Sequence, residues 1–145
     1  MDEHIGYGEV VFEIVDRSGK VVLEKKFRNY IAQDLSKAIV NALSGNTPVV
    51  EQIDVVRLNT SAGTVDLTPT VSVSTVNYGY RVEIYAEDSS SNSYTVYRAW
   101  VGNSSVPLKY LYKDSINISK PSDKKLRITW RYYDVYRIPS GWINF

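Results

Sequence analysis

The chain has 145 residues, of which 43% are hydrophobic, with 17 Lys and Arg against 16 Asp and Glu and no cysteine. This length and apolar content suit one compact domain over residues 1–145, and the absence of cysteine excludes disulfides and thiolate metal sites. A net charge of +1 is far from the strongly basic balance that favours general nucleic-acid binding, so no specific nucleic-acid partner is expected. No apolar run approaches the roughly 20 residues that cross a bilayer, and the acidic start Met1 to His4 does not resemble a signal peptide.

The first 45 residues predict a β-hairpin followed by a short helix. Residues 9–15 and 21–27 are rich in strand-forming residues, and Gly19 between them can adopt the positive φ of a hairpin loop. After Asn29, apolar residues recur every four positions, and Gly45 supplies a stop signal. This period predicts an amphipathic helix of about three turns near residues 31–44, with Ile31, Leu35, Ile39 and Leu43 on one face.

From Val49 onward the composition favours strands almost to the end of the chain. The expected strands are 52–58, 70–76, 78–87, 94–101, 108–112, 115–119 and 125–136, separated by polar, Gly-containing or Pro-containing loops. Two alternating sets should each face a core, namely Tyr78, Tyr80, Val82, Ile84 and Ala86, and Leu126, Ile128, Trp130 and Tyr132. About seven to nine strands with one helix predict a mainly β fold, an antiparallel β-sandwich of jelly-roll-like or immunoglobulin-like type.

The sequence offers no recognisable catalytic or metal-binding constellation, so neither an enzyme nor a cofactor is expected. The sole histidine, His4, lies near the N-terminus, which disfavours a Ser-His-Asp triad and leaves too few ligands for a zinc site. Carboxylates four residues apart on a strand, as in Glu9 with Glu13 or Glu83 with Glu87, are separated by about 13 Å. That separation is too large for the acid pair of a glycosidase.

Aromatic residues mark candidate interfaces. Twelve tyrosines accompany only three Phe and three Trp, which suits either cross-strand packing or contact with other molecules. Residues 138–145 form an apolar, aromatic tail that either folds back onto its own domain or docks into a neighbouring subunit. The candidate interface residues are Tyr132, Tyr133, Tyr136, Trp142, Ile143 and Phe145.

Two polar loops supply candidate ligand-binding positions, namely Ser90 and Asn92 in one loop and Asn103 and Ser104 in another. Asn59, Asn103 and Asn117 match the N-glycosylation pattern, which is a weak signal in a serine-rich chain. Charge is uneven, since residues 109–137 hold eight basic and three acidic side chains (+5) and residues 1–108 hold nine and thirteen (−4). Either strand faces partition charge in this way, or opposite ends of neighbouring subunits attract.

Five short segments between residues 29 and 132 carry a resemblance to a known class of proteins. They are Asn29-Tyr30-Ile31, Leu43-Ser44-Gly45, Ile53-Asp54-Val55-Val56-Arg57-Leu58, Arg81-Val82-Glu83-Ile84 and Leu126-Arg127-Ile128-Thr129-Trp130. Their order resembles small structural proteins of viruses, in particular tail-fibre and baseplate-associated proteins of head-tailed phages and comparable proteins of archaeal viruses. Asn59 stands where such proteins often have glycine, and the aromatic tail has no counterpart in the pattern.

The resemblance implies a non-catalytic structural component of a virus particle, such as a tail, spike or capsid-associated protein. Such a protein is made in the host cytoplasm, resides in the virion and self-assembles through β-edges and terminal segments. Its expected partners are further copies of the chain or other virion proteins. The alternative is a carbohydrate- or cell-surface-binding β-sandwich module that recognises a host-surface glycan or protein.

Overall fold

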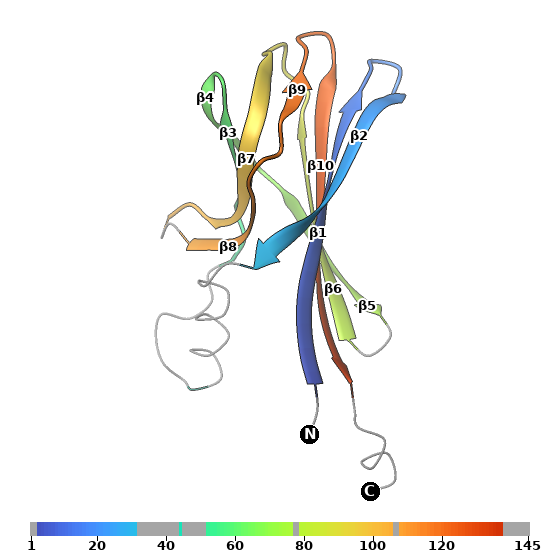
Figure 1. Ribbon diagram of the computed structural model, residues 1–145, viewed down its shortest axis with the longest axis vertical. Coiled ribbons are helices and arrows are strands. Elements are labelled where there is room, and N and C mark those ends of the chain that lie inside the picture. The colour runs from blue at the N-terminus through green and yellow to red at the C-terminus, as the bar shows by residue number, and fades with distance from the viewer. Residues whose placement is uncertain (1–2, 32–43, 45–51, 77–78, 106–107, 138–145) are drawn as a thin grey trace, which may run out of the picture.

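The computed structural model describes residues 3–31, 44, 52–76, 79–105 and 108–137 (Figure 1). Apart from Ser44, which has a helical backbone, the described residues form strands and their connections. The strands are β1 (Glu3–Val15), β2 (Val21–Ile31), β3 (Val55–Thr60), β4 (Gly63–Leu67), β5 (Thr70–Val76), β6 (Gly79–Asp88), β7 (Tyr94–Asn103), β8 (Leu108–Lys113), β9 (Ile118–Lys120) and β10 (Lys125–Arg137).

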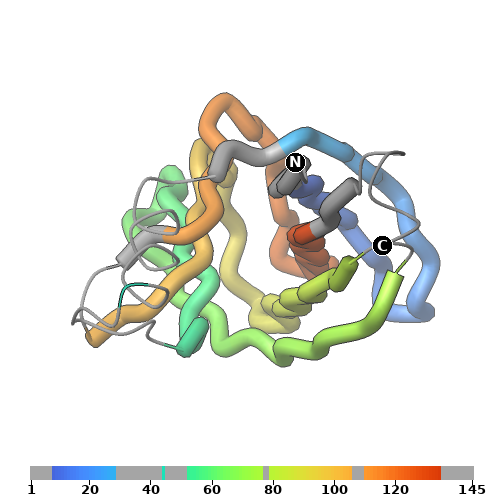
Figure 2. Tube along the Cα trace, turned by 90° about the horizontal axis from the view of Figure 1, so that it is seen from below, coloured from blue at the N-terminus to red at the C-terminus, as the bar shows by residue number. Residues whose placement is uncertain are grey.

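The strands pair antiparallel in two sheets. Sheet A has the order β2-β1-β10-β6-β5, and sheet B has the order β4-β3-β7-β8, with β9 also paired to β7. Strand β2 joins the sheets, because it pairs with β1 along most of its length and with β8 through Tyr30 and Ile31. Seen from below, β2 curves from one sheet to the other around the core (Figure 2). The expectation of a mainly β, sandwich-like chain is thus confirmed in this general form.

The helix expected near residues 31–44 is not seen among these elements. Ile31, the first apolar position of the expected period, ends β2 and pairs with Leu111 of β8. Residues 32–43 lie outside the described residues. Because Tyr and Ile favour strands and β8 offers an open edge, pairing decides the structure of this position against the four-residue period.

Strand positions from the sequence are largely confirmed, with two informative differences. Strand β5 has the expected bounds, but β4 was not expected, because no strand was predicted between residues 58 and 70. Strand β3 instead continues to Thr60, and Ser61 and Ala62 form a tight turn before β4, in which Thr60 Oγ1 accepts from the Ala62 N–H and donates to the Gly63 carbonyl. Gly63 has φ +100°, a conformation that favours glycine, and the chain therefore reverses within four residues.

The expected strand 115–119 is wrong in its first half. Ser115 and Asn117 have φ values of 54° and 52°, which belong to the left-handed region and cannot continue a strand. The buried Ile116 between them donates its N–H to the Tyr97 carbonyl, and pairing with β7 resumes only at Ile118. The edge beside β7 is therefore occupied by β8 and β9 in succession.

The core lies between the two sheets. From sheet A it receives Val10, Phe12, Ile14, Ile84, Ala86, Leu126, Ile128 and Trp130, and from sheet B it receives Val56, Leu58, Val96, Val101, Leu111 and Ile118. Phe12 meets Trp130 edge-to-face with ring centres 6.4 Å apart, and it meets Phe27 in the same way at 6.0 Å. The inward face predicted for β10 is confirmed, because Leu126, Ile128 and Trp130 are fully buried.

The inward face predicted for β6 is confirmed only in part. Ile84 and Ala86 are buried, but Tyr80 is 55% exposed, and Tyr78 lies outside the described residues. The reason is the unequal length of the sheets, since the lower ends of β1, β10, β6 and β5 extend beyond sheet B (Figure 1). The alternation of apolar residues along a strand specifies the face of the sheet on which a side chain lies, but that face is buried only where a second sheet covers it.

Candidate functional site

One end of the molecule gathers three connections that are distant in sequence. The β1–β2 turn (16–20), the β6–β7 loop (89–93) and the β9–β10 turn (121–124) meet there, and we call this region the loop end. Two predicted ligand-loop residues, Ser90 and Asn92, are exposed in the central loop. The loop end therefore presents one of the two predicted ligand-binding loops to solvent.

A buried lysine holds the central loop in place. Lys120 is 1% exposed, and its Nζ donates to the carbonyl oxygens of Ser90 at 2.7 Å, Asn92 at 2.5 Å and, more weakly, Pro121 at 3.4 Å. Its Nζ also lies 5.8 Å from the centre of the Tyr94 ring. A charge buried in this way is tolerated because backbone carbonyls replace its hydration shell. The loop around Ser90 is accordingly fixed from beneath.

Sequence reasoning missed Lys120. The available signal is the alternation within β9, because Ile118 and Lys120 are buried and Ser119 between them is exposed. A lysine on an apolar face is more often an edge residue that reaches solvent, so the pattern alone does not distinguish the two cases.

A buried carboxylate supports the same loop. Asp88 is 7% exposed, and its side chain accepts hydrogen bonds from the Tyr94 hydroxyl and from the Ser90 N–H. Burial raises the pKa of Asp88, but the hydrogen bonds from Ser90 and Tyr94 and the charge of Lys120 outweigh it and hold that pKa below its usual range. Burial, followed by the hydrogen bond to Asp88, raises the pKa of the Tyr94 hydroxyl, which therefore remains a donor.

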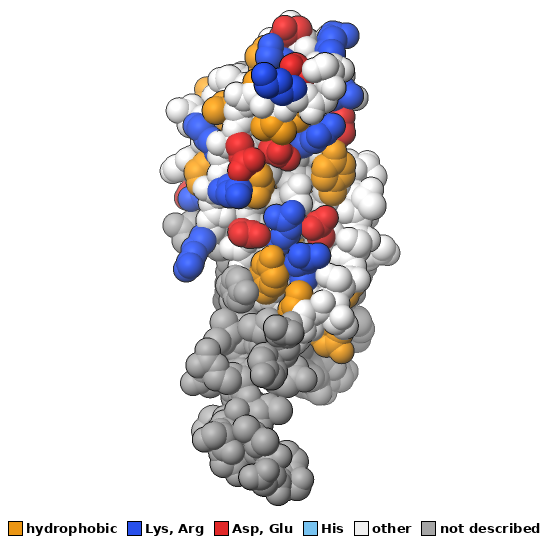
Figure 3. Space-filling model, turned by 90° about the vertical axis from the view of Figure 1, so that its right-hand side faces the viewer, with side chains coloured by type: hydrophobic (Ala, Val, Ile, Leu, Met, Phe, Trp, Pro, Cys, Tyr) orange, Lys and Arg blue, Asp and Glu red, His pale blue; other side chains and the backbone are white. Residues whose placement is uncertain are grey.

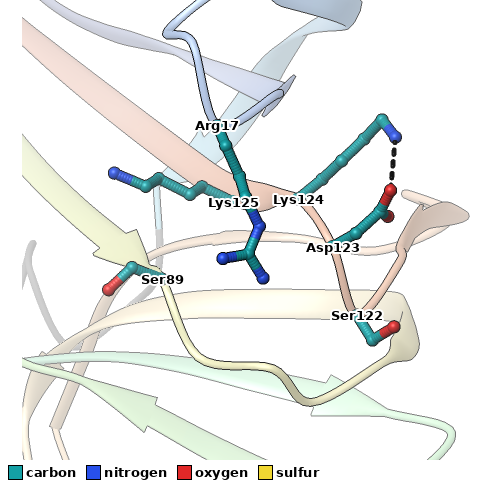
Figure 4. A pocket seen from close by; sticks show the side chains of 6 residues that line it. All are labelled: Arg17, Ser89, Ser122, Asp123, Lys124 and Lys125. Carbon is teal, nitrogen blue, oxygen red and sulfur yellow. Dashed lines mark hydrogen bonds and ion pairs between the residues drawn. The ribbon is translucent and has the colours of Figure 1, made fainter.

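A small cleft opens at the loop end (Figure 4). It has a volume of about 50 Å³ and is lined by Arg17, Ser89, Ser122, Asp123, Lys124 and Lys125. The Arg17 guanidinium lies in the middle of the cleft, between the Ser89 and Ser122 hydroxyls, while Lys124 turns toward Asp123 at 3.2 Å. The charged groups that line it are three cations and one carboxylate.

The outer face of sheet A carries rows of alternating charge. Arg131 of β10 contacts Glu83 of β6 at 3.0 Å and Glu9 of β1 at 3.5 Å. Closer to the start of β10, Arg127 and Lys125 approach Glu87 of β6 at 3.8 and 3.5 Å. Acidic and basic side chains are accordingly intermixed on this side of the molecule (Figure 3). The basic excess of residues 109–137 is thus offset within the sheet by acidic residues of β1 and β6.

Strand β5 forms the outer edge of sheet A. Among the described residues it pairs with β6 alone, in an unbroken register from Thr70 opposite Tyr85 to Val76 opposite Gly79. It contains no charged residue and no proline, and Val73 is 66% exposed. The sequence correctly bounded this strand but gave no sign that it would lie at an edge.

The second predicted ligand loop is used differently from the first. Asn103 is buried, and its side-chain amide donates to the Gln52 carbonyl at 2.7 Å. Ser104 is exposed, but its N–H and hydroxyl both donate to the Asp54 carboxylate. These bonds tie the loop to the segment before β3, so its polar groups serve the fold. Of the other two glycosylation-pattern residues, Asn59 is half-buried within β3 and Asn117 is exposed.

The predicted interface residues are divided among different environments. Tyr132 packs partly buried against the core, and burial, followed by the charge of Asp134, raises its pKa to about 12. Tyr133 lies on the opposite face and is half-buried, opposite Arg81 in the register. Tyr136 belongs to β10, whereas Trp142, Ile143 and Phe145 lie outside the described residues. Of the six, Tyr132 and Tyr133 are thus on opposite faces of β10.

No group of three or more potential metal ligands occurs in the described part of the chain. Within those same residues, no helix is long and apolar enough to cross a membrane. Comparisons with protein-family models, with curated proteins and with solved structures find no match to this chain.

Proposed function

We propose that this chain is a structural subunit that assembles with further copies of itself through the edge of β5. We further propose that it does so as a component of a virus particle, in line with its resemblance to tail-fibre and baseplate-associated proteins. The observation that carries the assembly proposal is the exposed, uncharged and unbroken strand Thr70–Val76 at the end of sheet A.

An edge strand presents unpaired backbone N–H and C=O groups, which natural proteins usually protect with charge, proline or irregularity. The opposite edge, β4, has only five residues and carries Asp66, which Arg57 holds through hydrogen bonds of 2.6 and 2.8 Å. The part of β2 that does not pair with β8 carries Glu24, Lys25, Lys26 and Arg28. Strand β5 has neither kind of protection, so it is the edge best suited to accept another strand.

Strand β5 is also complementary to itself. When two copies pair antiparallel about Val73, each Val73 faces its counterpart, Val71 faces Thr75, and Ser72 faces Ser74. These pairs join residues on the same side of the sheet, and no like charges oppose each other. Such a twofold contact joins two A sheets into one continuous sheet and satisfies the backbone groups of both edges.

The surface beside this edge adds apolar area to the contact. In the register with β6, Val71, Val73 and Thr75 lie opposite Ile84, Val82 and Tyr80, and they share the inward side of sheet A. Val71, Val73 and Tyr80 are nevertheless exposed, because sheet B does not cover this part of sheet A. Pairing two edges brings these exposed strips next to each other, and burial of apolar area stabilises the pair by about 25 cal/mol per Å².

Val73→Lys tests the proposal, because it places two ammonium groups opposite each other at the centre of the contact. The matched control is Val22→Lys, at a position that is 48% exposed on the charge-rich strand β2. Light scattering and sedimentation should show that the wild type and Val22→Lys associate as concentration rises, and that Val73→Lys stays monomeric. The thermal transition of Val73→Lys should match that of the dilute, monomeric wild type. A wild-type protein that stays monomeric at about 1 mM, or a Val73→Lys variant that associates normally, would contradict the proposal.

A further inference from the structure

The cleft at the loop end has the features of an anion site. Arg17 of the β1–β2 turn, Lys124 of the β9–β10 turn and Lys125 at the start of β10 line it. The Ser89 and Ser122 hydroxyls stand on either side of the Arg17 guanidinium, whereas the ammonium groups of both lysines turn away from it (Figure 4). Lys124 is paired with Asp123 and Lys125 with Glu87, whereas Arg17 makes no hydrogen bond or ion pair with any described residue. The charge of Arg17 helps to lower the pKa of Asp123, after the hydrogen bond and charge of Lys124, but the Arg17 N–H groups form no hydrogen bond with a described residue and can donate to a ligand.

The three connections that form the cleft are fixed by their own bonds. Asp16 closes the first turn by accepting from the Ser18 N–H at 3.0 Å and the Lys20 N–H at 2.9 Å. Lys120 holds the carbonyls of the second loop, as described above. In the third, the Lys124 N–H donates to the Pro121 carbonyl at 3.3 Å. Because the loops are ordered before a ligand arrives, binding requires little further loss of conformational freedom.

The size and donor set of the cleft favour a small oxyanion. Its volume of about 50 Å³ is several times that needed for one water, which leaves room for a group of a few heavy atoms. A guanidinium presents two parallel N–H groups that match two oxygens of a tetrahedral anion, and the serine hydroxyls can donate to the remaining oxygens. We propose that this cleft binds a phosphate or sulfate group, with Arg17 as the principal ligand.

This site is separate from the edge proposed for assembly. None of the residues that line the cleft belongs to β5, and the pairing of β5 with β6 ends at Tyr85, four residues before Ser89. Exposed ion pairs are individually weak, and an isolated anion should therefore bind with a Kd of about 1 mM.

The test is an amide NMR titration of the full chain with sodium phosphate and with sodium sulfate, with sodium chloride added to keep the ionic strength constant. Saturable shifts are expected for Ser89, Ser122 and Lys124, with none from chloride alone. Arg17→Gln should bind about fivefold more weakly, whereas Arg98→Gln, which changes an exposed arginine on β7, should bind as the wild type does. Asp123→Asn should bind about twofold more tightly, because it removes the one carboxylate that lines the cleft.

The gain in Asp123→Asn separates a binding site from a merely structural effect, since damage to the fold does not improve affinity. A sulfated oligosaccharide that binds much more tightly than inorganic sulfate supports a site for a sulfate carried on a glycan, whereas equal affinities support a site for the free ion. Shifts that grow linearly without saturation, that chloride reproduces, or that Arg17→Gln leaves unchanged would overturn the proposal.

Discussion

Replacing the buried Lys120 of β9 by methionine should destabilise the protein. The substitution keeps the length of the side chain but removes the ammonium that donates to the Ser90, Asn92 and Pro121 carbonyls. It also removes the nearby positive charge that helps to keep Asp88 ionised. The β6–β7 loop then loses its hydrogen bonds to β9, and the buried Asp88 carboxylate loses a nearby positive charge that offsets its loss of hydration.

The magnitude follows from opposing contributions. Two of the hydrogen bonds are short, and hydrogen bonds to charged groups each contribute about 1.5–3 kcal/mol. Against this, a buried ammonium costs several kcal/mol in lost hydration, which methionine does not incur. Because Ser90 and Asn92 are exposed, water can reach part of the vacated carbonyls. We expect Lys120→Met to lower the free energy of unfolding by about 2–3 kcal/mol, or about 8 °C in Tm.

Urea unfolding followed by tryptophan fluorescence measures this change directly. Lys124→Met is the matched control, because Lys124 lies four residues away and forms an ion pair at the surface with Asp123. The control should unfold with the wild type. A Lys120→Met variant as stable as the wild type, or more stable, would refute the reasoning, since the cost of burying the charge would then exceed the value of its hydrogen bonds.

Two further predictions concern other buried polar groups. The lowered pKa of Asp88 contributes stability that is present above its unfolded value of about 3.9 and is lost as pH falls through the folded value. The difference in urea midpoint between the wild type and Asp88→Asn should therefore shrink below about pH 4, and a difference that stays constant with pH would contradict this assignment. Trp130 is fully buried, and its Nε1 has no hydrogen-bond partner among the residues that the structure describes. Trp130→Phe should therefore lower the free energy of unfolding clearly less than Trp130→Ala, for which a loss of about 3–5 kcal/mol is expected in thermal or urea unfolding. Equal losses from the two variants would show that the indole N–H contributes to stability.

Local pattern predicted the strands because their determinants are local. Period-two alternation at Leu126, Ile128 and Trp130 reflects the pleat of a single strand, so the inward face could be assigned without knowing its neighbours. Gly19, at φ +91°, occupies the hairpin turn where its freedom was expected to be used. The exposed position of Ser90 and Asn92 in a loop followed from composition in the same way.

By itself, the sequence determined that this protein is built of alternating strands, where most of them lie and which faces are apolar, because pleat and turn chemistry are read within a few residues. Only the tertiary structure decided the order of strands, and with it that β5 is an edge, that Tyr80 is left uncovered and that Lys120 meets the carbonyls of a loop about thirty residues away in the chain. The tertiary structure likewise brings Arg17, Ser89 and Lys124, which are distant in sequence, to the lining of one cleft. The physical reason is that pairing and layer closure bring distant segments together, and no local period in the chain encodes which segments those are.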